Sequence, residues 1–260
     1  MPFFEELEWY ALLSTLSVQT ERCRSRPARR PRRGVLLAVA VLEEVAQHYG
    51  YDFLLLAKAS CPPVDETIGH NLNKTPNTEC DRWRNQSISR INAFDPQIVI
   101  VTGNDFDPGN AEDRPMPQDV YSAGPLKTLE DISARGRRLE ALGDISYLTT
   151  TGPVCLAANE GELQECTSVT PTAAPASHML AQEDAANKAD ATYISTIPWL
   201  CTPTKCPAII DDIDVYQDQF HITTVMCSTC SRSWRQLSSS TRPERLTAFA
   251  CGDRGSSISS

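Results

Sequence analysis

The sequence lacks any long hydrophobic run, and positive charge is scarcer in it than negative charge. Its longest uninterrupted apolar stretch is the eight residues from Val35 to Leu42, whereas a membrane-spanning helix needs about 20. Lys and Arg number 24 against 33 Asp and Glu, which gives a formal net charge of −9. We therefore expect no transmembrane segment and no nucleic acid or anionic membrane as a partner. No export signal is expected in this chain either, because Glu43 and Glu44 directly follow the apolar stretch and no small-residue cleavage site is present.

The composition is otherwise that of an ordinary globular protein. Of the 260 residues, 41% are hydrophobic and 22% are charged, which suffices for one α/β domain with a substantial core. Residues 22–33 depart from this composition, because they consist mostly of Arg and Pro and have no apolar period. Disorder or an origin in another reading frame is favoured for this block over an arm that binds an anionic partner.

Ten cysteines are many for a cytosolic protein of this size. Six of them form three couples that are close in sequence, namely Cys61 with Cys80, Cys155 with Cys166, and Cys201 with Cys206. Disulfides are favoured for these couples, since short bridged loops are typical of oxidising compartments. Free buried thiols remain the alternative, and a metal is disfavoured because no further His or Cys stands at ligand spacing. The couples predict a protein that works outside the cytoplasm.

Helical and strand-like patterns alternate along the chain. Helices are expected at residues 35–49, 79–93, 118–135 and 179–189, and strands at residues 53–57, 97–102, 138–148, 191–200 and 208–210. The β-branched run at 97–102 is typical of a strand buried on both faces of a parallel sheet. Because helices and strands alternate, we expect a doubly wound α/β fold with its loops, and its site, gathered at one edge of the sheet.

A short motif in the last fifth of the chain suggests chemistry. Asp218 precedes His221 by three residues. A carboxylate at this spacing can accept a hydrogen bond from the imidazole, fix its tautomer and stabilise its protonated form. Such a pair is the base half of a serine-hydrolase site. The spacing alone fits a surface ion pair equally well, so its sequence context has to decide.

Six sequence blocks, in the same order, resemble the SGNH domain fused to membrane acyltransferases of acyltransferase family 3. The blocks are residues 58–63, 79–84, 95–100, 143–147, 193–207 and 215–223. They contain Cys61-Pro62-Pro63, Cys80 followed by Trp83-Arg84, and Asp218 followed by His221-Ile222-Thr223. The resemblance covers about residues 40–224. It implies an α/β fold of the SGNH hydrolase type, a three-layer, flavodoxin-like parallel sheet, here with perturbed N- and C-terminal ends.

The resemblance implies O-acyl transfer or ester hydrolysis on a cell-surface polysaccharide. A serine attacks the acyl carbonyl, His221 acts as base and then as acid, and Asp218 orients His221. Gly103 and Asn104 end the third predicted strand, where the family's oxyanion donors are expected; a turn-forming role for Asn104 is the alternative. No cofactor is implied. The implied partners are an acyl donor, a surface glycan acceptor and the membrane acyltransferase domain of an intact parent, which places the domain outside the cytoplasm.

Both ends of the chain depart from the family's pattern. The family's Gly-Asp-Ser turn belongs well before Leu42 and is absent there, and Ser14, Ser17 and Ser25 are not expected in a strand–turn–helix context. We expect an SGNH-like domain at residues 35–225, between an atypical basic segment at 1–34 and an atypical Ser/Arg/Cys-rich tail at 226–260. Both ends resemble GC-rich coding sequence translated out of frame. A Gly-Asp-Ser in another frame of the DNA before codon 42 would support this hypothesis, and its absence from every frame would refute it.

Because the nucleophile block is missing, we expect turnover to be absent or impaired, and two other functions stay open. One is a non-catalytic remnant or carbohydrate-binding module. The other is a disulfide-redox or zinc-binding protein using Cys227 and Cys230, although no second cysteine pair stands at zinc spacing. The acidic run at residues 211–214 is expected to be a solvated loop, and Trp83 and Trp199 are expected to pack in the core.

Overall fold

The computed structural model describes residues 9–14, 52–58, 61–69, 75–103, 118–223 and 225–226. The chain divides into two compact units, and each is described by itself. The first, called the sheet unit, comprises Met1–Leu36, Ala46–Gly143 and Ser177–Ile194, and the second, called the hairpin unit, comprises Leu37–Val45, Asp144–Ala176 and Ser195–Ser260. The helix expected at residues 35–49 lies outside the described residues. Among the described helices, none has the length and apolar character that a membrane crossing requires.

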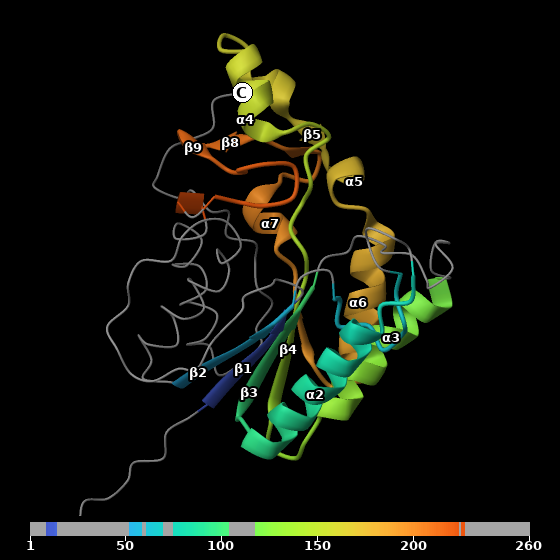
Figure 1. The fold of residues 1–260 in the computed structure, drawn as a ribbon. Helices are drawn as coiled ribbons and strands as arrows, with labels where there is room; N and C mark the ends of the chain where they lie inside the picture. Colours follow the sequence, from blue (N-terminus) through green and yellow to red (C-terminus); the bar gives the residue numbers. More distant parts are fainter. Residues whose placement is uncertain are drawn as a thin grey trace, which may run out of the picture. The chain divides into compact units, whose positions relative to one another are not determined.

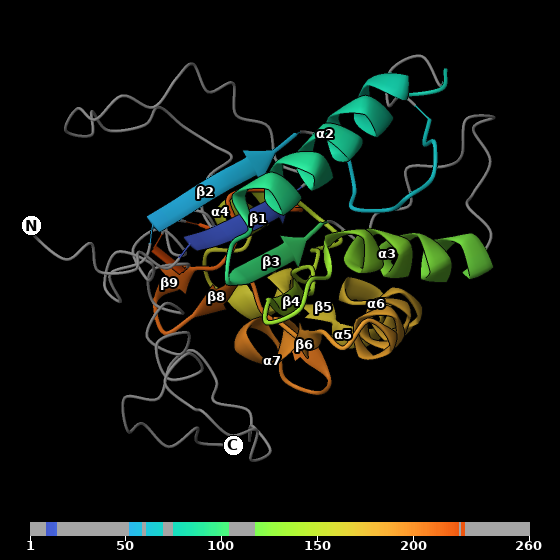
Figure 2. The same cartoon turned by 90° about the horizontal axis from the view of Figure 1, so that it is seen from below.

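Five parallel strands form the central sheet of the sheet unit, in the order β2-β1-β3-β4-β6 (Figures 1 and 2). The strands are β1 (Trp9–Ser14), β2 (Asp52–Ala57), β3 (Ile98–Thr102), β4 (Arg138–Leu142) and β6 (Thr192–Ile194). With β6 counted as the fifth strand, this is the 2-1-3-4-5 order of flavodoxin-like folds. The predicted α/β fold with a parallel, flavodoxin-like sheet is therefore confirmed.

Strand β1 lies in a segment for which no strand is predicted. Its residue Leu12 is opposite Leu55 of β2 on one side and opposite Ile100 of β3 on the other. Ser14 is the last residue of β1, and because the residues that follow it lie outside the described part of the chain, its expected lack of a strand–turn–helix context stays a prediction. The run Trp-Tyr-Ala-Leu-Leu has the nearly continuous apolar character of a central parallel strand. The strands that pair with β1 come much later in the chain, however, and a single short apolar run does not predict them.

Helices α2 (Thr78–Phe94), α3 (Gln118–Ile132) and α6 (Ala176–Lys188) lie on one side of this sheet (Figures 1 and 2). The chain crosses the sheet in one direction from β2 through β3 and β4 to β6, and right-handed crossovers then put all the connecting helices on the same face. The core cluster of this unit is Leu56, Ile91, Val99, Val101, Leu129, Ile132, Leu139, Ala141, Ala186 and Ala191. Trp83 packs against it, as expected.

Several predicted elements are shorter in the structure. Helix α3 ends at Ile132, and Gly136, with φ of 84°, turns the chain into β4. Strand β4 ends at Leu142 rather than at residue 148. The strand expected at 191–200 is only β6, followed by the short helix α7 (Ile197–Leu200). Pro198 explains the division, because it lacks the N–H that a strand ladder needs but fits the first turn of a helix.

The hairpin unit consists of short elements around its own small core. They are α4 (Gly152–Ala158), the 3-10 helix η1 (Leu163–Cys166), β5 (Ser168–Val169), α5 (Thr170–Ala173), α7, β7 (Lys205–Cys206), β8 (Ile209–Ile210) and β9 (Ile213–Asp214). The core is Leu148, Cys166, Leu200, Ala208, Val215, Tyr216 and Met226, with Trp199 packed against it. A Gly-Pro pair predicts a loop at Gly152-Pro153; this prediction is wrong, because α4 begins there with Pro153 in its first turn.

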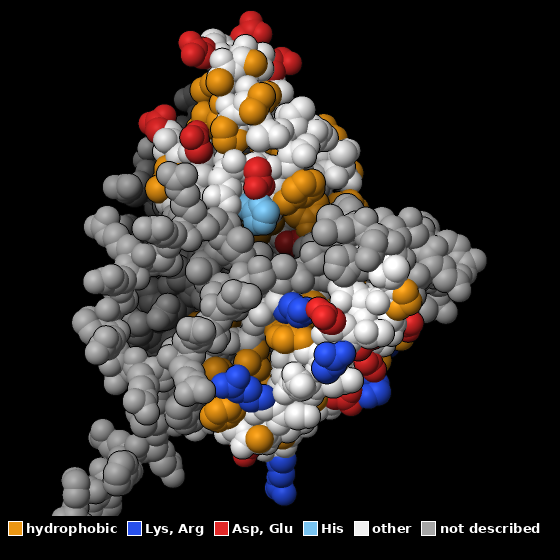
Figure 3. Space-filling view, in the orientation of Figure 1, with side chains coloured by type: hydrophobic (Ala, Val, Ile, Leu, Met, Phe, Trp, Pro, Cys, Tyr) orange, Lys and Arg blue, Asp and Glu red, His pale blue; other side chains and the backbone are white. Residues whose placement is uncertain are grey.

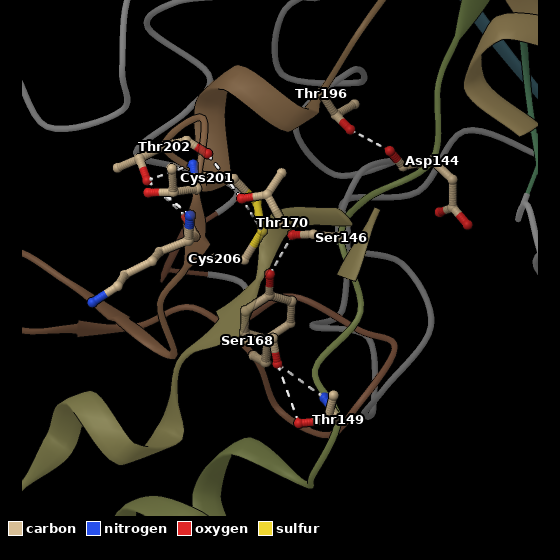
Figure 4. The surroundings of a disulfide bond; sticks show 12 residues. Asp144, Ser146, Thr149, Ser168, Thr170, Thr196, Cys201, Thr202 and Cys206 are labelled. Carbon is tan, nitrogen blue, oxygen red and sulfur yellow. Dashed lines mark hydrogen bonds between the residues drawn. A yellow bond between two sulfur atoms is a disulfide. The ribbon is translucent and has the colours of Figure 1, made fainter. Parts of the chain in front are cut away.

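All three cysteine couples form disulfides. Cys61–Cys80 is in the sheet unit, and Cys155–Cys166 and Cys201–Cys206 are in the hairpin unit. Figure 4 shows the last of these beside Thr170 and Thr202, where the Thr170 hydroxyl donates to the Thr202 carbonyl over 2.9 Å. Two of the three bridges thus stabilise the unit that has the smaller apolar core.

Candidate active site

Asp218 and His221 lie on a loop at the end of the hairpin unit. Strands β8 and β9 form an antiparallel hairpin whose turn residues, Asp211 and Asp212, both have positive φ, as a type I′ turn requires. After β9 the chain doubles back once more: the Gln217 N–H donates to the His221 carbonyl over 2.8 Å, and the Thr223 N–H donates to the Val215 carbonyl over 2.8 Å. The inner of these two hydrogen bonds closes the loop of residues 217–221, which carries the predicted Asp–His pair.

The structure brings Asp218 and His221 into direct contact. His221 Nδ1 is 2.7 Å from Asp218 Oδ2. The other carboxylate oxygen, Oδ1, accepts hydrogen bonds from the N–H groups of Phe220 at 2.7 Å and of His221 at 2.8 Å. Since Nδ1 faces the carboxylate, Nε2 is the ring nitrogen that can exchange a proton with a substrate. The side chains are 43% (Asp218) and 40% (His221) exposed, so this nitrogen belongs to a surface site.

The contacts of Asp218 keep its carboxylate ionised. Partial burial raises the pKa, but hydrogen bonds from the Phe220 N–H, the His221 side chain and the His221 N–H lower it, and the net pKa lies below the ordinary value of 3.8. An ionised Asp218 can therefore hold His221 in one tautomer and stabilise the imidazolium formed when Nε2 takes a proton.

Three hydrogen bonds to residues 146–149 hold this loop. The hydroxyl of Tyr216, a residue that is 1% exposed, is hydrogen-bonded to Ser146 Oγ (Figure 4). Burial raises the pKa of Tyr216 to about 12, against the opposing effect of the Ser146 hydrogen bond, so the phenol stays neutral. Gln219 binds the segment before α4 twice: its carbonyl accepts from the Leu148 N–H, and its side chain donates to the Thr149 carbonyl, both over 3.1 Å.

Ser146, Tyr216 and Gln219 lie in the sequence blocks that carry the family resemblance, but the sequence predicts no role for them or for Thr149. Ser146 and Tyr216 stand 70 positions apart, and no local pattern relates them. The contact between Asp218 and His221 was predictable because the two residues are three apart in sequence. The contacts that position this pair are tertiary.

The predicted oxyanion residues belong to the sheet unit. Gly103 is buried and directly follows β3, whereas Asn104 lies outside the described residues. A cavity of about 30 Å³ adjoins Gly103, with walls from Pro62, Val64, Pro125, Leu129 and Leu142 among others. Its walls are mostly apolar, and its size is that of one water molecule or one methyl group.

Ser14 also lies at this edge of the sheet. Leu13 of β1 is opposite Val101 of β3, so Ser14 is level with Thr102, the residue before Gly103. Ser17 and Ser25 lie outside the described residues. Ser14 differs from the expected nucleophile in two respects: it follows Leu12-Leu13 rather than Gly-Asp, and it is still paired within the strand, opposite Ala57.

The alternative metal site gains no support. In the described parts of the chain, no group of three or more His, Cys, Asp or Glu side chains could hold a metal ion. Asp211 and Asp212 are exposed turn residues, and Cys227 and Cys230 lie outside the described residues.

Comparisons relate the fold to known proteins. A family model described as an SGNH domain (fused to AT3 domains) matches residues 38–236. Among solved structures, the chain is similar to the periplasmic domain of a lipopolysaccharide acetyltransferase from Salmonella ser. Paratyphi A, with a TM-score of 0.61 and 12% identity over 86% of this chain and 80% of that one. At this identity the likeness shows the fold alone. No curated protein matches the sequence.

Proposed function

Because the chain belongs to the family of SGNH domains fused to AT3 domains, we propose that it is an O-acyltransferase or esterase domain that acts on a cell-surface polysaccharide. The observation that carries the proposal is the contact of 2.7 Å between His221 Nδ1 and Asp218 Oδ2. It supplies the base of a serine-hydrolase site on a chain whose family performs acyl transfer.

In the proposed reaction, a serine hydroxyl gives its proton to His221 Nε2 while its oxygen attacks the acyl carbonyl. The donor's leaving oxygen then takes that proton, and an acyl-serine remains. A sugar hydroxyl, or water, next gives its proton to Nε2 and attacks the acyl carbon, and the serine oxygen leaves and recovers the proton. Asp218 stays ionised throughout and orients the imidazole. The Gly103 N–H is our candidate donor to the oxyanion, with Asn104.

The family and the fold support the proposed partners. The structural neighbour is a lipopolysaccharide acetyltransferase periplasmic domain, which supports a glycan acceptor and a site outside the cytoplasm for this chain as well. The three disulfides agree with an oxidising compartment. The family's fusion to AT3 domains supports a membrane acyltransferase domain as the partner in an intact parent.

The small cavity beside Gly103 supports a short acyl group. A space of about 30 Å³ with mostly apolar walls accommodates the methyl of an acetyl group. A chain with a restored nucleophile should therefore cleave p-nitrophenyl acetate faster than the butyrate and octanoate esters. Equal rates on the three esters would contradict this assignment.

The test of the proposed function is to restore the missing serine. A Gly-Asp-Ser-His segment placed ahead of Leu42 should give hydrolysis of p-nitrophenyl acetate above buffer. His221→Ala in the restored chain should abolish it, because the serine then has no base. A restored, folded chain that hydrolyses no ester, or one whose activity survives His221→Ala, would refute the proposal.

A second candidate is a non-catalytic remnant that retains the fold and binds a glycan. The absence of Gly-Asp-Ser before Leu42 favours it, since an acyl-serine cannot form by the family's route without that serine. Glycan binding by the unaltered chain, with no ester hydrolysis and no rescue by the restored segment, would select this candidate.

A further inference from the structure

Next to His221 in the sequence, Phe220 exposes an aromatic ring that does not pack in the core of the hairpin unit. The Phe220 side chain is 48% exposed. It meets the ring of Tyr147 edge to face, with centroids 5.4 Å apart and planes at 77°. Tyr147 is half-buried, so the pair forms one aromatic surface in which Phe220 is the outer member.

The backbone on both sides of this pair is fixed by hydrogen bonds. The Phe220 N–H donates to Asp218 Oδ1 over 2.7 Å, and the Tyr147 N–H donates to the Ala173 carbonyl over 2.8 Å. The Leu148 N–H donates to the Gln219 carbonyl over 3.1 Å and links the two segments. Because the backbone that carries the exposed ring is already ordered, little conformational entropy is lost when a ligand binds, which suits a binding surface.

The charges of the described residues of the hairpin unit disfavour an anionic ligand. Its described acidic residues are Asp144, Glu160, Glu162, Glu165, Asp211, Asp212, Asp214 and Asp218, and its one described basic residue is Lys205. In Figure 3, red acidic side chains stand beside orange hydrophobic ones over α4 and η1, at the top of the view. A phosphate, a uronic acid polymer or an anionic lipid would be repelled by this surface, whereas a neutral ligand would not.

We propose that the Phe220 ring, held by its edge-to-face contact with Tyr147, is a platform on which a neutral pyranose ring of the acceptor glycan stacks. The C–H groups on the apolar face of a sugar carry partial positive charge and are attracted by the negative face of an aromatic ring. Because Phe220 and His221 are consecutive residues, with Cα atoms about 3.8 Å apart, a hydroxyl of the stacked sugar comes within reach of the imidazole. The role of the platform in acyl transfer rests on the proposed function, but sugar binding itself does not.

The experiment is a titration of the unaltered chain, followed by the aromatic ¹H–¹³C signals of Phe220 and Tyr147. Cellotetraose, maltotetraose and mannotetraose are the neutral probes, tetragalacturonate is the anionic probe, and octanoate tests for an acyl chain. At least one neutral tetrasaccharide should shift both rings with a Kd of about 1–10 mM, and tetragalacturonate should bind more weakly.

Variants of Phe220 test the platform itself. Phe220→Ala should weaken binding about tenfold or more, and Phe220→Trp should retain it. Phe220→Leu keeps an apolar side chain without the π face, and it should weaken binding as well, which guards against a folding defect in the alanine variant. Phe94→Ala is the matched control, because Phe94 is 46% exposed but lies on α2 in the sheet unit; it should leave the affinity unchanged.

Three results would overturn the inference: no ring shift with any neutral probe, binding that Phe220→Ala and Phe220→Leu leave intact, or preferential binding of octanoate or tetragalacturonate. The titration needs no nucleophile, so its outcome is independent of the ester assay. Sugar binding without restorable hydrolysis would refute the proposed function alone, and restorable hydrolysis without Phe220-dependent binding would refute the platform alone.

Discussion

The two units of this chain are stabilised in different ways. The sheet unit has a continuous parallel ladder and a core of ten buried apolar residues, which is the usual basis of an α/β fold. The hairpin unit has a smaller core, strands of two residues, two disulfides and a set of long-range polar contacts. The Asp218–His221 pair belongs to the second kind of structure. Its geometry should therefore depend on individual bridges and hydrogen bonds more than on apolar burial.

The largest expected effect is on the stability of the sheet unit. Ile91 of α2 is fully buried in the core, so Ile91→Ala should lower the free energy of unfolding by about 2–5 kcal/mol. Phe94→Ala, on the same helix, removes a half-exposed ring that Arg90 covers, and it should change this free energy by less than about 1 kcal/mol. Urea titration followed by circular dichroism measures both. If the two variants are equally stable, the assignment of this core is wrong.

Removal of single disulfides should affect the two units differently. Loss of either Cys155–Cys166 or Cys201–Cys206, by paired Cys→Ser changes, should lower the free energy of unfolding by about 2–4 kcal/mol. It should also abolish the low-field NMR signal of the proton on His221 Nδ1. Loss of Cys61–Cys80 should cost a similar amount but leave that signal in the folded protein. Mass mapping of secreted protein should find all three pairs linked. If the six thiols can be alkylated without reductant, the extracytoplasmic assignment fails.

A smaller effect is expected from the buried hydrogen bond between Ser146 and Tyr216. Ser146→Ala leaves the Tyr216 hydroxyl buried without its partner and should cost about 1–3 kcal/mol. Tyr216→Phe combined with Ser146→Ala removes both polar groups and should cost less than Ser146→Ala alone. The low-field His221 signal should broaden in Ser146→Ala. If the double and single variants lose the same stability, the hydrogen bond does not hold this loop.

The sequence predicts those elements and contacts that depend on neighbouring residues, and it does not predict those that depend on contacts between distant segments. Strands β2 and β3 and helix α2 follow from patterns within a dozen or so neighbouring residues, and the Asp218–His221 contact follows from their spacing. The sequence does not predict strand β1, because its pairing with β2 and β3 is non-local. It does not predict α4 either, because the pair Gly152-Pro153, with which the helix begins, is typical of a loop. The Ser146–Tyr216 contact joins residues 70 positions apart, which no periodicity could relate.

The smallest expected effect is the acid dependence contributed by Asp218. Its pKa is lower in the folded chain than the ordinary value of 3.8, so its stabilising contribution is present above that value and is lost as the pH falls through the folded pKa. Because the side chain is 43% exposed, solvent screening limits the contribution to less than about 1 kcal/mol. Asp218→Asn should therefore be slightly less stable than the unaltered chain at pH 7, and this difference should shrink as the pH falls below 3.8. A larger difference at pH 2 than at pH 7 would contradict the sign of the shift.

The central claim is that this chain keeps the base of an SGNH site but lacks its nucleophile. Labelling of the unaltered chain with a fluorophosphonate probe tests it most directly, because the probe reports only a serine activated by a base. Loss of a triad nucleophile costs on the order of a millionfold in rate in the best-studied serine protease, so we predict no labelling above that of a heat-denatured sample. The same chain with Gly-Asp-Ser-His ahead of Leu42 should label in a His221-dependent manner. Strong labelling of the unaltered chain that Ser14→Ala abolishes would contradict the claim, and would identify the last residue of β1 as the nucleophile.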